Sequence, residues 1–112
     1  MAEKYSFGID AGTPLIKSVI FNLASQEFGS GSQKVEIDSS GPTWMHQGMH
    51  AVWAATAVIT KHTIVNAGIN AADIGLACPT GNGDGAWMLD ASRNPIVPSL
   101  PWNHRRAANI VA

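Results

Sequence analysis

The stretch that decides the fold lies at residues 6–17 and reads SFGIDAGTPLIK. Its first six residues alternate between apolar and polar, which is the period of a β-strand. The run Gly12-Thr13-Pro14 is a turn signal, and residues 15–23 resume as a second apolar strand rich in β-branched side chains. The sequence therefore predicts a β-hairpin with Asp10 at the end of its first strand.

This hairpin has the residue types that bind a phosphate group. Glycine lets backbone N–H groups approach an anion closely, and Thr13 adds a hydroxyl donor. Asp10 could hold Mg²⁺ directly or through water, and Lys17 on the second strand could reach a phosphate. An ordinary hairpin with one exposed acid is the alternative that spacing alone leaves open. The sequence contains no Walker A string of the form G-x-x-x-x-G-K-[ST].

The elements on either side of residue 40 differ in period. A polar, glycine-rich turn is expected at residues 25–32, and a third antiparallel strand at 33–38. Apolar residues at helical spacing predict a helix over residues 47–67, with Gly68 as its end residue. The order of these elements indicates an α/β fold.

The last third of the chain is expected to be less regular. We expect a buried strand at residues 74–78 that includes a buried Cys78, and a glycine-rich loop at residues 79–85. A further strand at 86–89 and irregular structure to about residue 101 follow, since Pro95 and Pro98 disfavour a central strand. Residues 102–112 look like the beginning of a helix.

Composition sets limits on size and partners. The chain has 112 residues, enough for one domain at most. Charged residues make up 13%, about half the usual share for a soluble domain. This indicates that part of the surface is covered by another part of the protein or by a partner. A net charge of −1 gives no basic footprint for nucleic acid or anionic lipid. With a single cysteine and no leader or long apolar run, we expect a cytoplasmic protein.

The hairpin resembles the first phosphate motif of the FGGY carbohydrate kinases, a branch of the actin-like ATPase superfamily. The family pattern is Gly-x-Asp-x-Gly-Thr, then a small hydroxylated residue, two variable positions and a basic residue. The matching residues are Gly8, Asp10, Gly12, Thr13 and Lys17. Pro14 departs from the hydroxylated position and removes one backbone donor.

Three further strings resemble the family in the same order. Residues 44–47, WMHQ, are similar to Trp-x-Glu-Gln, with His46 in place of the glutamate. Leu89-Asp90 with the two following prolines resembles a short hairpin of the family. Residues 102–106, WNHRR, are similar to Trp-Asn-Asp-x-Arg, with His104 in place of the aspartate.

The loop at residues 80–87, TGNGDGAW, is similar to the Thr-Gly-Gln-Gly-Asp-Gly-Thr-Trp of polyol kinases of the erythritol type. Asn82 replaces the glutamine. An amide and a carboxylate can exchange hydrogen bonds with the hydroxyl groups of a polyol, so Asn82 and Asp84 are candidate substrate contacts. A tight structural turn is the alternative interpretation.

The resemblance implies an α/β, ribonuclease-H-like domain of three antiparallel strands, then a helix and further strands. It implies ATP-dependent phosphorylation of a small polyol or ketose. Asp10 would organise Mg²⁺, and the phosphate would be held by Gly12, Thr13 and Lys17. The substrate side would be shaped by Asn82, Asp84, Trp102 and Arg106.

The resemblance also implies a longer protein. Residues 1–112 would be the N-terminal portion of a first domain. The general base is expected beyond Ala112, and the nucleotide-binding second domain is expected outside these residues as well. The partners would be the remainder of the kinase chain and, in a homo-oligomer, further copies. The 112 residues alone are expected to be inactive.

Three other interpretations are weighed. His46 and His50 have the i, i+4 spacing of a helical zinc site. Asp10, Asp84 and Asp90 could serve a two-metal nuclease of the same fold. A non-catalytic sugar- or polyol-binding or interaction module is the third, and we keep it as the main alternative to the kinase.

Overall fold

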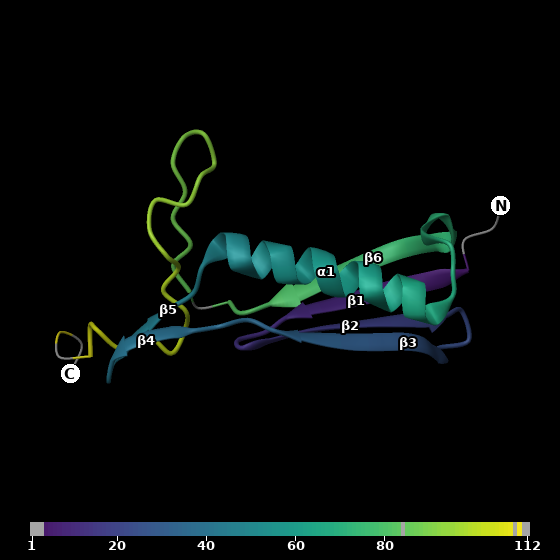
Figure 1. Cartoon of the computed structure of the whole chain (residues 1–112), viewed down its shortest axis with the longest axis horizontal. Helices are drawn as coiled ribbons and strands as arrows, with labels where there is room; N and C mark the ends of the chain where they lie inside the picture. Colours follow the sequence, from purple (N-terminus) through teal and green to yellow (C-terminus); the bar gives the residue numbers. More distant parts are fainter. Residues whose placement is uncertain (1–3, 84, 109, 111–112) are drawn as a thin grey trace.

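The computed structural model describes residues 4–83, 85–108 and 110. One helix lies against one face of a four-stranded sheet, and a two-stranded ribbon continues from the sheet end (Figure 1). The elements in chain order are β1 (Tyr5–Ala11), β2 (Leu15–Asn22), β3 (Glu27–Lys34), β4 (Asp38–Gly41), β5 (Trp44–His46), α1 (Met49–Ala67), the 3₁₀ turn η1 (Ala71–Asp73) and β6 (Ile74–Gly81).

The sheet confirms the predicted hairpin and the expected α/β class. Its strand order is β3-β2-β1-β6, with β1, β2 and β3 antiparallel and β6 parallel to β1. Asp10 pairs with Lys17 on β2 and with Thr80 on β6. The helical crossover between β3 and β6 is the connection that a parallel neighbour requires.

The third strand differs from its prediction. The predicted turn at residues 25–32 is shorter, because Asn22 Oδ1 accepts from the backbone N–H groups of Ala24 and Gln26 and closes the turn early. The strand therefore begins at Glu27, and its glycines serve packing rather than a turn. A Cβ on Gly31 would lie 2.7 Å from Ile59 Cδ1 of α1.

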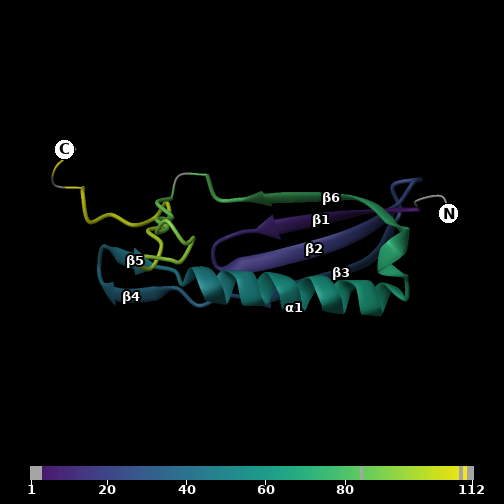
Figure 2. The same ribbon diagram turned by 90° about the horizontal axis from the view of Figure 1, so that it is seen from above.

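Helix α1 packs on β2 and β3 and closes the small core (Figure 2). It begins after Gly48, two residues later than predicted, and ends at Gly68, whose φ of 67° is the left-handed value expected of a helix C-terminus. Buried Ile16, Val35 and Ile59 form the centre of the core. Beside them the buried hydroxyl groups of Ser18 and Thr63 share a hydrogen bond.

The chain after β3 contains two strands that the sequence pattern missed. β4 and β5 are only four and three residues long, too short to display a period. After β6, residues 86–100 form a protruding arm held by isolated bridges between Ala86 and Leu100 and between Leu89 and Pro95. The predicted strand at 86–89 is therefore wrong, since a proline opposite it offers no N–H donor for a ladder.

The helix predicted at residues 102–112 is also wrong in the described part, which forms turns. Tertiary contacts compete with the helix: Arg105 N–H donates to the carbonyl of Thr43, and Nδ1 of His104 lies 2.8 Å from the carbonyl oxygen of Met45. These bonds fasten the segment to β5 instead. The end of the predicted helix, at Ala112, lies outside the described residues.

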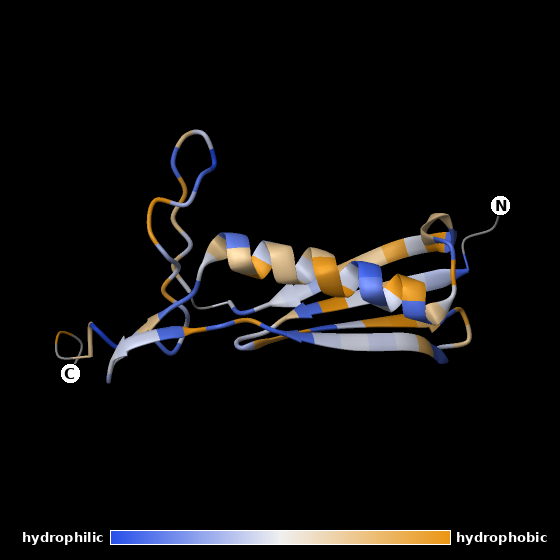
Figure 3. Ribbon diagram, in the orientation of Figure 1, coloured by the Kyte–Doolittle hydropathy of each residue, from blue (hydrophilic) through white to orange (hydrophobic). Residues whose placement is uncertain are grey.

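Several large or apolar side chains are exposed, among them the cysteine that was predicted to be buried. β6 runs three residues beyond its predicted end, and Cys78 on it is exposed, because β6 is an edge strand away from α1. Trp53 on α1 and Trp102 are 73% and 61% exposed. Apolar residues occur along both α1 and the arm (Figure 3). Within the described residues, no helix is long and apolar enough to span a membrane.

Candidate phosphate and substrate site

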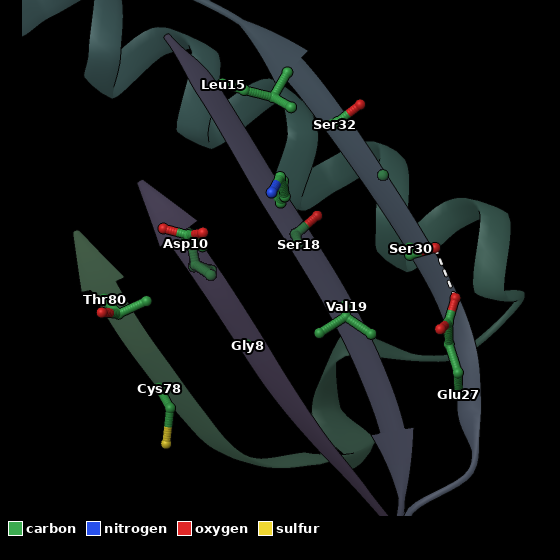
Figure 4. A pocket seen from close by; sticks show the side chains of 13 residues that line it. Gly8, Asp10, Leu15, Ser18, Val19, Glu27, Ser30, Ser32, Cys78 and Thr80 are labelled. Carbon is green, nitrogen blue, oxygen red and sulfur yellow. Dashed lines mark hydrogen bonds between the residues drawn. The ribbon is translucent and has the colours of Figure 1, made fainter. Parts of the chain in front are cut away.

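The candidate site lies on the sheet face opposite α1. Figure 4 looks onto this face with the helix behind it. A hollow of about 680 Å³ is lined by side chains from all four strands, among them Asp10, Lys17, Ser30, Ser32 and Thr80. The alternation of each strand explains the arrangement, since the residues between these positions turn toward α1.

Asp10 lies near the end of β1, which is one of the two inner strands of the sheet. It is exposed on β1, with the exposed Lys17 opposite it on β2 and Thr80 opposite it on β6. The carboxylate therefore stands next to a cation on one side and a hydroxyl on the other. Oxygen ligands of this kind suit Mg²⁺, and an ammonium group suits a phosphate.

Thr80 was missed by the sequence interpretation, which assigned it to a loop. Thr80 can be identified from the parallel register of β1 and β6. In that register Asp10 pairs with Thr80, which requires β6 to extend beyond residue 78. A strand ending in Pro79-Thr80-Gly81 lacks the apolar run on which the prediction relied.

Gly12 keeps the hairpin turn open beside Asp10. A Cβ at this position would lie 2.8 Å from the carbonyl oxygen of Leu15 and 3.6 Å from Asp10 Oδ1. Backbone oxygen cannot give way at that distance without moving the strand. Glycine therefore leaves space next to the Asp10 carboxylate that a hydrated cation can use.

Asn82 and Thr13 bring two sequence motifs together. Asn82 Nδ2 donates a hydrogen bond to Thr13 Oγ1, which joins the end of β6 to the hairpin turn across 69 residues of sequence. The threonine hydroxyl accepts in this bond, so its own proton remains available to a ligand. The carbonyl oxygen of Asn82 likewise remains available as an acceptor.

The other predicted substrate residues lie apart from this pair. Arg106 contacts β5: its guanidinium lies 3.9 Å from the centre of the Trp44 ring, and its Nη2 lies 3.1 Å from His46 Nε2. Trp102 belongs to the same segment and is largely exposed. Asp84 lies outside the described residues.

The general base is not matched to any described residue. The sequence interpretation expects it beyond Ala112, and Ala112 itself lies outside the described residues. The described site therefore consists of phosphate-binding and substrate-binding candidates, and its catalytic base stays a prediction about the rest of the protein.

The rival metal sites are not assembled. His46 lies on β5 and His50 on α1, so the two histidines do not share one helix. Across residues 4–83, 85–108 and 110, no group of three or more His, Cys, Asp or Glu residues is placed to hold a metal ion.

Asp90 has a structural task at the tip of the arm. Its Oδ1 accepts from the backbone N–H groups of Ser92 and Asn94, both at 2.8 Å. The N–H of Asn94 contributes most to lowering the pKa of this carboxyl below its ordinary value. Because the Asp90 carboxylate already accepts these two hydrogen bonds, it is a poor candidate ligand for the two metal ions of a nuclease site.

Comparison with known proteins places the chain in a family. The N-terminal domain of the FGGY family of carbohydrate kinases matches residues 5–112. A glycerol kinase of Lactobacillus delbrueckii subsp. bulgaricus is 26% identical over 112 residues, covering 98% of this chain and 22% of the relative. A xylulose kinase of Klebsiella pneumoniae is 28% identical over 102 residues, covering 90% of this chain and 20% of the relative.

Solved structures agree on the fold. The xylulose kinase of Rhodospirillum rubrum superposes with a TM-score of 0.87 at 20% identity, over 96% of this chain and 22% of that one. The Plasmodium falciparum glycerol kinase with ADP gives 0.82 at 13% identity, over 98% and 22%. The chain thus spans about a fifth of the length of these relatives. It belongs to the FGGY family of carbohydrate kinases and corresponds to their N-terminal domain.

Proposed function

We propose that the protein containing this chain transfers the γ-phosphate of ATP to a hydroxyl group of a small polyol or ketose, with erythritol as the first substrate to test. The family membership supports sugar or polyol phosphorylation, and relatives carry the names glycerol kinase and xylulose kinase. The erythritol-like choice rests on the loop at residues 80–87 and its resemblance to polyol kinases.

The observation that carries the proposal is the hydrogen bond between Asn82 and Thr13. It joins the loop proposed to read the substrate to the turn proposed to hold the phosphate. Phosphoryl transfer depends mainly on positioning and charge stabilisation, and this hydrogen bond holds the two proposed binding elements next to each other.

Each residue of the site then has a role. Thr13 donates its free hydroxyl proton to a phosphate oxygen while it accepts from Asn82, and the carbonyl oxygen of Asn82 accepts from a substrate hydroxyl. Lys17 attracts the phosphate from the open sheet face. Asp84 and, from the segment beside β5, Trp102 and Arg106 complete the proposed substrate side.

The site fits Mg²⁺ and the phosphates of ATP. The Asp10 carboxylate is exposed, and the absence of a side chain at Gly12 leaves space beside it. Asp10 would hold the metal directly or through water. When bound, Mg²⁺ neutralises charge on the phosphates during transfer. We further propose that residues 1–112 are the N-terminal part of the first domain, and that the general base and the adenosine pocket lie beyond Ala112.

The test uses the complete reading frame that contains this chain. The purified protein is assayed with ATP, Mg²⁺ and a panel of tetritols, pentitols, ketoses and glycerol. We expect turnover on erythritol or a related polyol, and no turnover by the 112 residues alone. Phosphorylation of xylulose or glycerol only would contradict the polyol assignment. Turnover by the 112 residues alone would contradict the expected location of the base.

Two variants test the site. Asp10→Asn should lower kcat about 100-fold or more, because a ligand of the metal that neutralises the phosphates is lost. Asp73→Asn is the matched control at the opposite end of the sheet and should leave kcat unchanged. Equal effects of the two variants would show that Asp10 has no special role. A protein that binds polyols without any turnover would support the non-catalytic binding module instead.

A further inference from the structure

Two histidines stand where the sequence motifs of the family carry acids, and the fold stacks them. The rings of His46 on β5 and His104 in the C-terminal segment lie 5.5 Å apart between centroids, with their planes 15° from parallel. Arg106 completes the group through His46 Nε2 and the Trp44 ring. These four residues, Trp44, His46, His104 and Arg106, form what we call the histidine clamp.

We propose that His46 and His104 are positioning residues: as a neutral pair they hold Arg106 and the segment around Trp102 against β5, and acid releases that segment. The consequence for catalysis rests on the proposed function, in which Trp102 and Arg106 belong to the substrate side. The clamp itself is a property of the fold and is tested separately below.

The contact of His46 requires a neutral ring. Arg106 Nη2 can only donate, so His46 Nε2 must accept and carry no proton. Protonation of Nε2 removes the acceptor and places a second cation 3.1 Å from the guanidinium. The contact between Arg106 and the face of Trp44 remains, but a cation that is repelled by its neighbour no longer has one fixed position.

His104 has a second reason to stay neutral. Its Nδ1 lies 3.1 Å from Met45 N and 2.8 Å from Met45 O, so one tautomer accepts from the N–H and the other donates to the carbonyl. Its Nε2 is buried and has no hydrogen-bond partner among the described residues. In the tautomer whose Nδ1 donates to the Met45 carbonyl, Nε2 carries a lone pair. Protonation would then bury an N–H without an acceptor, which is more costly than burying a lone pair.

Charged groups of both signs surround the clamp. On the C-terminal segment, Arg105 adds a further cation beside Arg106. On the other side, Glu36 and Asp38 line a hollow of about 620 Å³ together with His46, and Asp38 pairs with His46 in the β4–β5 ribbon.

These two carboxylates would attract a protonated His46 away from Arg106. The first turn of α1 carries a further histidine, His50. Histidine is in general the side chain whose charge changes between about pH 5 and 8, so this is the range in which the proposal is tested.

Hydrogen exchange tests the clamp without reference to activity. In the complete protein, the peptide covering residues 102–108 is compared at about pH 7.5 and about pH 5.5, after correction for the intrinsic exchange rate. We expect its protection to fall about tenfold at the lower pH, whereas a peptide from α1 keeps its protection. Unchanged protection of residues 102–108 overturns the proposal.

A conservative double variant separates titration from packing. In His46→Gln with His104→Asn, side-chain amides can make the same contacts to Arg106 and Met45 but cannot gain a proton. We expect its protection to be the same at both pH values. His62→Gln, an exposed position on α1, is the control and should behave as the unaltered protein. Equal acid sensitivity of the double variant and the control overturns the proposal.

Kinetics connects the clamp to the reaction. For the unaltered enzyme, KM for the polyol should rise about tenfold from about pH 7.5 to about pH 5.5, and the double variant should lose this rise. A pH-dependent clamp in a protein without kinase activity supports the clamp and contradicts the proposed function. An active kinase in which residues 102–108 stay protected at acid pH contradicts the clamp alone.

Discussion

Gly12 shows how a single residue fixes the geometry of the candidate site. A Cβ there would lie 2.8 Å from a backbone oxygen, whereas nothing lies within 4 Å of a Cβ placed on Gly83. We predict that Gly12→Ala lowers the free energy of unfolding by about 1–3 kcal/mol, because the hairpin must shift to make room. Gly83→Ala is the matched control and should leave it within about 0.5 kcal/mol in urea denaturation. Equal losses would contradict the steric explanation.

Asp90 gives a pH-dependent prediction at the same scale. Its pKa is lowered in the folded chain, first by the N–H of Asn94, from an ordinary value of 3.8. The ionised carboxylate therefore stabilises the turn fully at pH values above 3.8. This stabilisation is lost as the pH falls through the lower pKa of the folded chain. We expect the amide resonances of Ser92 and Asn94 to shift in NMR only in that acid range. Asp90→Asn should abolish the titration, and amide shifts that begin near neutral pH would contradict the assignment.

At the scale of elements, the contact between α1 and the sheet depends on one buried polar pair. Ser18 on β2 is 3% exposed, Thr63 on α1 is fully buried, and their hydroxyl groups share a hydrogen bond. We predict that Thr63→Val destabilises the chain by about 1–3 kcal/mol, because it leaves the Ser18 hydroxyl buried without a partner.

The double variant Thr63→Val with Ser18→Ala separates the unpaired hydroxyl from lost packing. It should recover part of the loss in urea denaturation, since no buried polar group is then left alone. A double variant that loses the sum of both single effects would show that the hydrogen bond contributes nothing beyond packing.

The elements also show how far residue periodicity can predict secondary structure. The strands β1 and β2 and the helix α1 are long enough to display their periods, and all three were predicted. The third strand was predicted at residues 33–38, later than the observed β3, because glycines at 29 and 31 read as a turn. Those glycines instead allow α1 to approach, with Cβ contacts of 2.9 and 2.7 Å to Ala67 and Ile59 if either were alanine. A glycine that is required by packing cannot be told from a turn glycine by sequence alone.

The whole molecule is more extended than a closed domain of its size. Its radius of gyration is 16.9 Å, against about 13 Å expected for 112 residues. Large apolar side chains are exposed on several elements, including Leu23 at 81%, Trp53 at 73% and Ile96 at 61%. This agrees with the low charged fraction of the sequence. The open sheet face and the arm both offer surface that a longer protein could cover.

We therefore predict that the isolated 112 residues bind a hydrophobic dye or self-associate. Exposed apolar patches of this kind favour association because burying them removes apolar area from water. The measurements are dye fluorescence and light scattering after size-exclusion chromatography, with the complete protein as the control of low dye binding. A monodisperse monomer that leaves the dye silent would contradict our proposal that these residues are part of a larger domain.

Some residues of the candidate site can be predicted from the local sequence, whereas others are placed only by long-range contacts. The hairpin, Asp10 and Lys17 follow from alternation over neighbouring residues, and the strands place them on one face as the period requires. Thr80 could not be found, because its place beside Asp10 depends on the register of a parallel strand 70 residues away. Arg106 was assigned to the substrate side from its motif alone, and the fold places it against Trp44 and His46.

By itself the sequence determined the hairpin, the helix, the phosphate-binding residue types and the resemblance to the FGGY kinases, because each is encoded in a short period or motif. Only the tertiary structure decided which motifs meet. It joined Asn82 to Thr13, stacked His46 on His104 and left the Asp10 face of the sheet open. The physical reason is that side-chain contacts across tens of residues depend on strand register and on how closely the helix can approach the sheet. Those quantities are set by the packing of all the elements together.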